Sequence, residues 1–292
     1  MSSLKFYKDY KNDQKLRDQF FEFTPKALYG ADFKQWYLKG AWSNYYKPYS
    51  FGDGRQLVAN VSFSTMELYL EGNPVKGIQL ATVGTLPEYR NRGLSRQLME
   101  TVLEVCDAEA ELVFLFANES VLDFYPKFGF KAVRECLFQT DILGIESSPC
   151  ARQLDLNDKK DFELLRRMTG NRLPLTKVFG AHNYDHILLW HLIYYFGECI
   201  WYLEENDLIF IAEADGNTWH LFDILSTDSF SFKTVLPNIL PQGTDRMVCH
   251  FTPDLLDMDF QILACEMESP LFVRGDFPLK ELTFKFPALA QT

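Results

Sequence analysis

The chain has 292 residues, which suits two domains of about 150 residues each better than one small domain. Apolar residues make up 47% and charged residues 24%, so the chain can bury real cores and is not a disordered protein. Its formal net charge of −11 argues against a duplex nucleic-acid binder and suits a cationic small substrate such as an amine. Most of that charge lies in residues 151–292, which carry 12 basic and 21 acidic side chains.

Neither a secretory signal nor a membrane span is predicted. Residues 1–20 lack an apolar core, and the longest apolar run, Ile187–Phe196, has ten residues against the roughly 20 that cross a bilayer. We expect that run to be a buried helix. The six cysteines form no CxxC pair, which predicts reduced thiols, no metal site and a cytoplasmic protein.

Hydrophobic periodicity and turn residues divide the first half into helices and strands. In chain order we expect helices over 13–28 and 32–39, strands over 56–63, 66–70 and 75–86, a helix over 94–107, a strand over 112–117, a helix over 118–125 and a strand over 130–140. This order is typical of an α/β domain with a mixed sheet.

A similar order of elements restarts after residues 146–149, the predicted linker. We therefore expect an N-terminal domain over 1–145 and a C-terminal domain over 150–292. The second half is predicted to hold a strand at 152–156, helices at 159–168 and 182–196, strands at 200–203, 208–212 and 219–225, a helix at 230–240 and a strand at 246–251.

The segment RNRGLSR, residues 90–96, lies between a predicted strand and a predicted helix. Free N–H groups and the positive dipole end of a helix favour an anion there, and Gly93 would let a phosphate approach the backbone. Taken alone, so short a pattern also fits a plain capping turn. The predicted pyrophosphate-binding residues are Arg90, Asn91, Arg92, Gly93, Leu94, Ser95 and Arg96.

The surrounding sequence favours the anion-binding interpretation. Together with this loop, the flanking strand and helix, Asn118 and the run FYPKFGF at 124–130 resemble the GNAT acyltransferase superfamily over about residues 50–140. The family loop is R/Q-x-x-G-x-G/A, and this chain has Ser95 at its last small position. The resemblance implies a mixed-sheet acyl-CoA N-acyltransferase fold with acetyl-CoA as co-substrate.

The resemblance also implies roles for individual residues. Backbone groups of Val83, Gly84 and Thr85 would contact the pantetheine arm, and Asn118 would lie beside the cofactor. Tyr125 would protonate the leaving thiolate of CoA. This role is chemically coherent, because a tyrosine with a pKa of about 10 suits a thiol of about 8.5.

The second half looks like a degenerate GNAT domain. Its corresponding junction, residues 225–230, has neither Arg nor Gly, and Asp228 would repel a diphosphate. We therefore expect one CoA site per chain, in a tandem arrangement that resembles the Eis-like acetyltransferases. In that branch the C-terminal carboxylate reaches the active site, which makes Thr292 a candidate base. Other carboxylate candidates, among which the sequence does not choose, are Asp53, Glu67 and Glu71.

Two further groups of residues are candidates for a role in the site. The spacing of His182 and His186 can ligate a metal, but no HExxH motif or third ligand accompanies them, so we expect surface or interdomain histidines. Aromatic residues lie where GNAT enzymes build the acceptor wall, and we expect most in the core and some in that wall. They are Trp36, Tyr37, Trp42, Tyr45 and Tyr46.

The leading hypothesis is an N-acetyltransferase that moves an acetyl group from acetyl-CoA to a primary amine of a small, cationic acceptor. An alternative is a non-catalytic acyl-CoA-binding regulatory or interaction protein. A third interpretation, a tandem aminoacyl transferase, predicts no CoA loop and a basic tRNA-binding surface, which the charge of −11 disfavours. No nucleic-acid or membrane partner is expected, and the sequence leaves homo-oligomerisation open.

Overall fold

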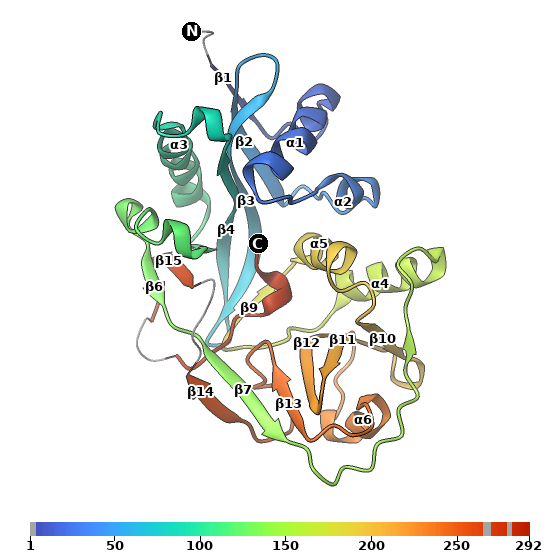
Figure 1. Cartoon of the computed structure of the whole chain (residues 1–292). Helices are drawn as coiled ribbons and strands as arrows, with labels where there is room; N and C mark the ends of the chain where they lie inside the picture. Colours follow the sequence, from blue (N-terminus) through green and yellow to red (C-terminus); the bar gives the residue numbers. More distant parts are fainter. Residues whose placement is uncertain (1–3, 265–269, 279–281) are drawn as a thin grey trace.

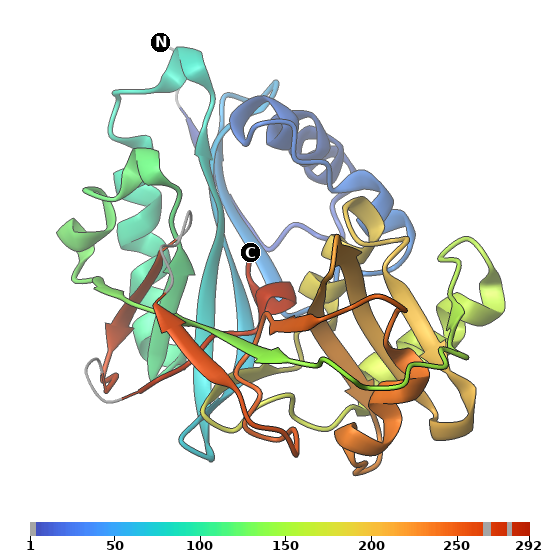
Figure 2. The same cartoon turned by 60° about the horizontal axis from the view of Figure 1, so that its bottom comes forward.

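The computed structural model describes residues 4–264, 270–278 and 282–292. Two mixed sheets lie next to each other, with helices packed against both (Figures 1 and 2). Within the described ranges the first sheet has the order β1-β2-β3-β4-β5-β15-β6, with β9 also paired to β3, and the second has the order β14-β7-β13-β12-β11-β10-β8. The C-terminal end of the chain lies between the two sheets, near helix α5 (Figure 1).

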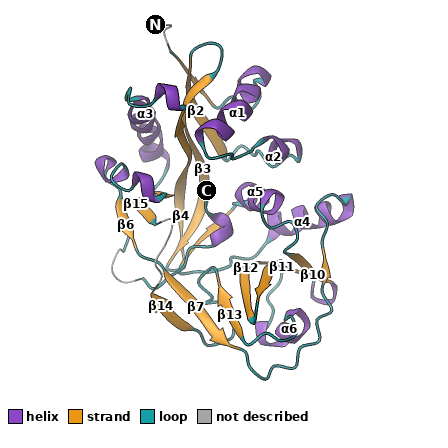
Figure 3. Cartoon of the chain, viewed as in Figure 1, coloured by secondary structure: helices purple, strands orange, loops and turns teal. Residues whose placement is uncertain are grey.

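Figure 3 shows the helices in purple and the strands of both sheets in orange. The α-helices are α1 (Gln14–Ala27), α2 (Lys34–Leu38), α3 (Leu94–Glu109), α4 (Lys159–Asn171), α5 (Asp185–Tyr194) and α6 (Phe232–Ile239). The strands of the first sheet are β1 (Lys5–Lys8), β2 (Tyr46–Gly52), β3 (Leu57–Leu70), β4 (Asn73–Thr85), β5 (Leu112–Phe116), β6 (Lys131–Val133), β9 (Phe179–His182) and β15 (Leu271–Gly275). Those of the second are β7 (Cys136–Asp141), β8 (Arg152–Gln153), β10 (Ile200–Leu203), β11 (Leu208–Asp215), β12 (Thr218–Ser226), β13 (Arg246–Cys249) and β14 (Gln261–Ala264).

Most of the predicted helices and strands are present. Strands β1 and β2 of the first half were not predicted, and three predictions for that half differ from the structure. Residues 56–63 and 66–70 belong to one long strand, β3, because its buried Ser62 and Ser64 continue the ladder instead of forming a turn. The predicted helix over 118–125 is replaced by two 3-10 turns, Glu119–Val121 and Tyr125–Phe128. The predicted strand over 130–140 is divided into β6 and β7, which belong to different sheets.

The two sheets exchange strands between the halves of the sequence. Strands β9 and β15 of the second half pair in the first sheet, and β7 of the first half pairs in the second sheet. The mixed α/β fold is confirmed, whereas the boundaries 1–145 and 150–292 stay a prediction. The second half does repeat one feature of the first, because β12 and β13 flank α6 and run parallel, as β4 and β5 do around α3.

Helices α1 and α3 pack on opposite faces of the first sheet (Figures 1 and 2). Asp13 precedes helix α1 as its N-cap, and its carboxylate accepts a hydrogen bond from the Leu16 N–H. Helix α3 buries one apolar face against β2, β3 and β4. That face consists of Leu94, Leu98, Met99, Val102, Leu103 and Cys106.

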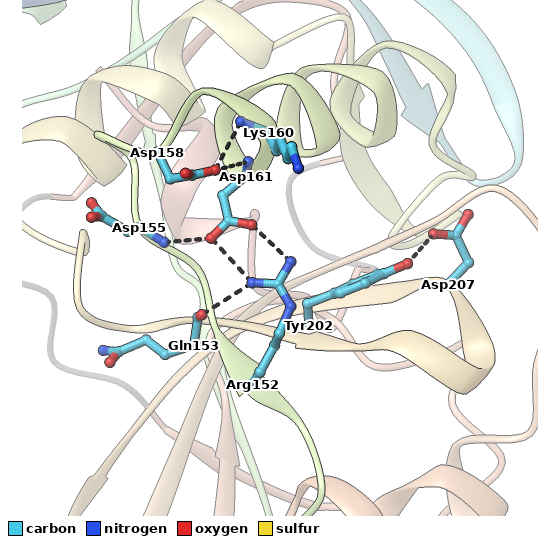
Figure 4. Close-up of polar contacts among 8 residues, drawn as sticks. All are labelled: Arg152, Gln153, Asp155, Asp158, Lys160, Asp161, Tyr202 and Asp207. Atoms are coloured by element: carbon cyan, nitrogen blue, oxygen red, sulfur yellow. Dashed lines mark hydrogen bonds and ion pairs between the residues drawn. The ribbon is translucent and has the colours of Figure 1, made fainter.

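A polar cluster fixes the start of α4 against the edge of the second sheet (Figure 4). The Asp158 carboxylate caps the helix by accepting hydrogen bonds from the N–H groups of residues 160 and 161. Asp161 forms a 2.7 Å ion pair with Arg152 of β8 and also accepts the Asp155 N–H. The hydrogen bond from Arg152 lowers the pKa of the Asp161 carboxyl, so this pair is charged at neutral pH. The polar groups of this cluster hydrogen-bond to one another, so the cluster stabilises the packing of α4 against the second sheet.

Candidate active site

A cavity of about 870 Å³ extends along β4 between the N-terminus of α3 and helix α5. It is lined by all the predicted cofactor-binding residues, namely Val83, Gly84, Thr85, Arg90, Asn91, Arg92, Gly93, Leu94, Ser95 and Arg96. Both predicted catalytic residues, Asn118 and Tyr125, also line it. The structure therefore brings these residues, which the sequence places over 43 positions from 83 to 125, to one cavity.

The cavity opens where β4 and β5 separate. The two parallel strands pair from Gly77 to Gln79 and no further, although β4 continues to Thr85. Beyond that point β4 carries a bulge, because Thr82 and Val83 together lie opposite Val61 of β3. Thr82 takes a left-handed backbone with φ of 45°. This interruption of the ladder leaves main-chain groups of β4 at the cavity instead of in the sheet.

A buried hydrogen-bond network holds the bulge. The Tyr46 hydroxyl donates to Ser62 Oγ at 2.9 Å and lies 2.6 Å from Thr82 Oγ1. The Asn60 amide donates to the main-chain oxygen of Thr82 at 2.8 Å, and Ser50 Oγ donates to the Asn60 carbonyl oxygen. Burial raises the pKa of Tyr46 above its usual value, so the phenol stays protonated. A fully satisfied network of this kind makes the bulge a rigid part of the cavity wall.

The loop before α3 is shaped by two residues with positive φ, Asn91 at 60° and Gly93 at 77°. Gly93 is the N-cap of α3, and a side chain built there would meet no atom within 4 Å. The space beside the N-cap of α3 is therefore open, and the first turn of an α-helix has N–H groups without partners inside the helix. Such a terminus favours an anionic group.

Side chains of the loop are held by neighbouring main-chain oxygens. Arg90 Nε donates to the Thr85 oxygen at 3.2 Å, and Arg92 donates to the Glu88 oxygen at 2.7 Å. The Ser95 hydroxyl lies 2.7 Å from Thr85 Oγ1 and ties the helix start to the end of β4. Serine at this position is thus used in packing the loop, while the arginines keep their positive charge at the cavity.

None of the three acidic residues considered as a base lines the cavity. The Asp53 carboxylate accepts hydrogen bonds from the N–H groups of Arg55 and Gln56 and from the Tyr89 hydroxyl at 2.8 Å, and these bonds lower its pKa. Glu67 and Glu71 lie at the far end of β3, next to β9. Asp53 instead anchors the β2–β3 turn to the loop that carries Tyr89.

Tyr125 is buried at the β5 side of the opening. Its ring packs against Phe124, Phe130 and Phe272, with centroid distances of 5.4, 6.1 and 6.0 Å. Burial raises its pKa to about 12. Among the described residues no group forms a hydrogen bond with its hydroxyl, which is therefore a protonated donor that remains available to a ligand.

Helix α5 of the second half supplies part of the cavity wall. His186 is buried, and its Nε2 lies 2.9 Å from Ser64 Oγ of β3 while Nδ1 has no hydrogen-bond partner in the described structure. Burial lowers its pKa to about 3, so the ring is neutral. His182 has a different neighbour, the Arg172 oxygen at 3.4 Å. No cluster of three or more potential metal ligands occurs among the residues that the structure describes.

The C-terminal tail also reaches the cavity, which Gln291 and Thr292 line. The buried Gln79 side chain holds the tail from β4: its carbonyl oxygen accepts the Thr292 N–H at 2.6 Å and the Thr292 hydroxyl at 2.9 Å, and its amide donates to the Ala290 oxygen at 2.8 Å. Thr292, one of the candidate bases, therefore lines the cavity, and its role as a base stays a prediction.

The predicted aromatic group divides between the core and the cavity. Trp36 and Tyr46 line the cavity, whereas Tyr37 and Trp42 pack in the core and Tyr45 is 41% exposed. Sequence analysis missed much of the lining, which comes from separate segments and includes Phe33, Ser64, Ile187 and Trp190. No local motif marks them, because only the docking of α5 brings them together.

Comparison with known proteins identifies the domain. The family described as "Acetyltransferase (GNAT) domain" matches residues 13–133. The chain contains a GNAT acetyltransferase domain. This GNAT domain is also 32% identical over 63 residues to N-alpha-acetyltransferase 50 of Danio rerio, a match that covers 20% of this chain and 38% of that protein.

Solved structures extend the likeness of fold to nearly the whole chain. A conserved protein of unknown function from Enterococcus faecalis V583, described as a probable N-acyltransferase, is 15% identical, with a TM-score of 0.57 over 93% of this chain and 72% of that one. Eis1 from Mycobacterium abscessus is 14% identical, with a TM-score of 0.56 over 93% and 73%. The mixed α/β fold of GNAT acyltransferases is thereby confirmed over most of the chain. In the described ranges no helix has the length and apolar character needed to cross a bilayer.

Proposed function

We propose that the protein is an acetyl-CoA-dependent N-acetyltransferase that moves an acetyl group directly to a primary amine of a small molecule. The observation that carries this proposal is the single cavity that joins the open N-terminus of α3 at Gly93 to Tyr125 and then to a separate wall on α5. A donor thioester and an acceptor amine need such a shared space in order to meet.

The residues present fit an acyl-CoA. Phosphate groups have backbone N–H donors at Gly93 and positive charges nearby, and the interrupted ladder of β4 offers main-chain groups to an amide-containing arm. The cations that line this end are Arg90, Arg92, Arg96 and Lys127. When bound, acetyl-CoA supplies an acetyl thioester, which is an activated acyl donor.

The chemistry requires one bond to form and one to break. The neutral amine nitrogen attacks the acetyl carbonyl carbon, the new C–N bond forms, the C–S bond breaks, and sulfur keeps the electron pair. Main-chain N–H groups of the β4 bulge would stabilise the charge that develops on the carbonyl oxygen. Tyr125 would give its proton to the thiolate, and the amine proton leaves to solvent or to a group at the tail, where a role for Thr292 stays a prediction.

The test is release of free thiol from acetyl-CoA by the purified protein, with and without an added amine panel, and mass spectrometry of the product. We expect thiol release that needs both substrates and an acetylated amine in equal amount. Acetyl-CoA binding with no amine-dependent turnover would instead favour a non-catalytic acyl-CoA-binding protein.

A further inference from the structure

The acceptor end of the cavity differs from the CoA end in its chemistry, and it is formed mainly by aromatic rings. Phe33 is the centre of this aromatic wall. Its ring lies 5.6 Å from Trp36, 6.1 Å from Tyr46 and 5.8 Å from Trp190, measured between centroids. Ile187 of α5 lines the same cavity. The aromatic wall, meaning Phe33, Trp36, Tyr46 and Trp190, is thus contiguous.

Both halves of the chain fix these rings in place. Trp36 Nε1 donates to the His186 oxygen at 2.6 Å, and Trp190 Nε1 donates to the Asp32 oxygen at 3.0 Å. The Tyr46 hydroxyl is used in the network at the β4 bulge. Because their polar atoms already have partners, these residues offer a ligand their apolar faces and few hydrogen bonds.

The chain's acidic surplus is absent from this wall. Among the described residues that line the cavity none is Asp or Glu, and the cationic ones lie at the CoA end. The net charge of −11, which suits a cationic substrate, is thus not reflected among the described lining residues. His186 is neutral, and the polar groups near the wall are few, chiefly Ser64, Thr82 and Thr292.

From this wall we infer that the acceptor is a primary amine carried on an aromatic ring system, of the arylalkylamine class. The inference rests on the proposed function and names its substrate class. A polyamine would leave charges unpaired inside the cavity, and an amino sugar would leave many hydroxyl groups without partners, both of which cost free energy. An aromatic ring carries neither additional charges nor hydroxyl groups. The few polar groups present can hydrogen-bond to its single amine.

The first test compares tryptamine, spermidine and glucosamine as acceptors. We expect kcat/KM for tryptamine to exceed the other two at least tenfold. In parallel, each amine is titrated calorimetrically into enzyme saturated with CoA, where no reaction occurs, and tryptamine should bind at least tenfold more tightly. Tighter binding or faster turnover of spermidine or glucosamine would overturn the inference while leaving the proposed function intact. Binding of tryptamine without turnover would contradict the proposed function but not the inference. Binding of none of the three amines would overturn the inference.

A second test alters the cavity lining without removing a ring of the aromatic wall. Ala31 is small, half-buried and lines the cavity on the α1–α2 connection. Ala31→Glu should raise the ratio of spermidine to tryptamine kcat/KM at least tenfold relative to the matched Ala31→Gln, which has the same size and no charge. Equal ratios in the two variants would show that this wall does not receive the acceptor amine.

Discussion

The indole nitrogen of Trp36 donates a 2.6 Å hydrogen bond to the main-chain oxygen of His186, although 150 positions separate the two residues. The bond joins α2 of the GNAT domain to α5 of the second half at the aromatic wall. The second half therefore completes the candidate acceptor pocket, even though its own strand–helix junction lacks the phosphate-binding residues.

Tyr125→Phe should lower kcat by about 10² to 10³, because the general acid is lost while the ring packing is kept. The Kd for acetyl-CoA should stay within a factor of about two, as measured by calorimetry. Tyr37→Phe, which removes a hydroxyl outside the cavity lining, is the matched control and should behave as wild type. Equal kcat values for the two variants would remove Tyr125 from the mechanism.

Gly84→Ala should loosen the contact between α1 and β4. A Cβ atom at Gly84 would lie 2.9 Å from Leu28 Cδ2 and 3.3 Å from Ala27 Cβ, so the Leu28 side chain must move and Ala27 at the end of α1 must give way slightly. We expect a loss of about 1–3 kcal/mol in the free energy of unfolding, measured in urea, and a raised KM for the amine. Adding Leu28→Ala makes room for the new methyl group and should restore part of the amine KM. No recovery would mean that the crowding at Leu28 is not the cause.

Gln79→Leu should release the tail from β4. The substitution removes the acceptor of the Thr292 N–H and hydroxyl bonds and leaves the Ala290 oxygen without its donor, which costs about 1–3 kcal/mol of stability. The amine KM should rise while the Kd for acetyl-CoA is kept, because the cavity's CoA end does not contact Gln79. If acetyl-CoA binding weakens as much as amine binding, the tail does not belong to the acceptor side.

His186 makes the folded state sensitive to acid. Its pKa falls from 6.5 to about 3 on burial, so the native ring stays neutral while the unfolded chain binds a proton below pH 6.5. The stability that this residue contributes is therefore complete above pH 6.5 and falls as the pH drops toward 3. Between pH 7.5 and 5.5, wild type should lose about 1.4 kcal/mol more than His186→Asn in urea unfolding. Parallel losses in the two proteins would contradict a buried neutral ring.

Local sequence signals predicted the loop 90–96, helix α3 and the place of Tyr125 near them, because each depends on neighbours within a few residues. The structure brings all three to one cavity, while phosphate binding and the general-acid role stay predictions. The exchange of strands could not be predicted in this way. Strand β15 pairs with β5 through contacts such as Leu271 with Phe116, which no short pattern encodes.

The acceptor side of the cavity was likewise only partly predictable from local sequence. Trp36 and Tyr46 were proposed from their aromatic character, but Phe33 and Trp190 joined them only through the docking of α5 onto α2. The division of 130–140 between two sheets has a similar origin. Buried Glu135 at the crossing is paired to Lys285 at 3.1 Å, a partner 150 residues away that fixes where the chain leaves the first sheet.

The central claim is that the cavity binds acetyl-CoA through the open helix terminus at Gly93. Calorimetric titration of acetyl-CoA into wild type, Gly93→Glu and Gly216→Glu tests it most directly, because both glycines have positive φ and open surroundings and only Gly93 lines the cavity. We predict micromolar binding to wild type and Gly216→Glu, and a loss of at least a hundredfold in Gly93→Glu. Undiminished binding to Gly93→Glu, or no binding to wild type, would contradict the account.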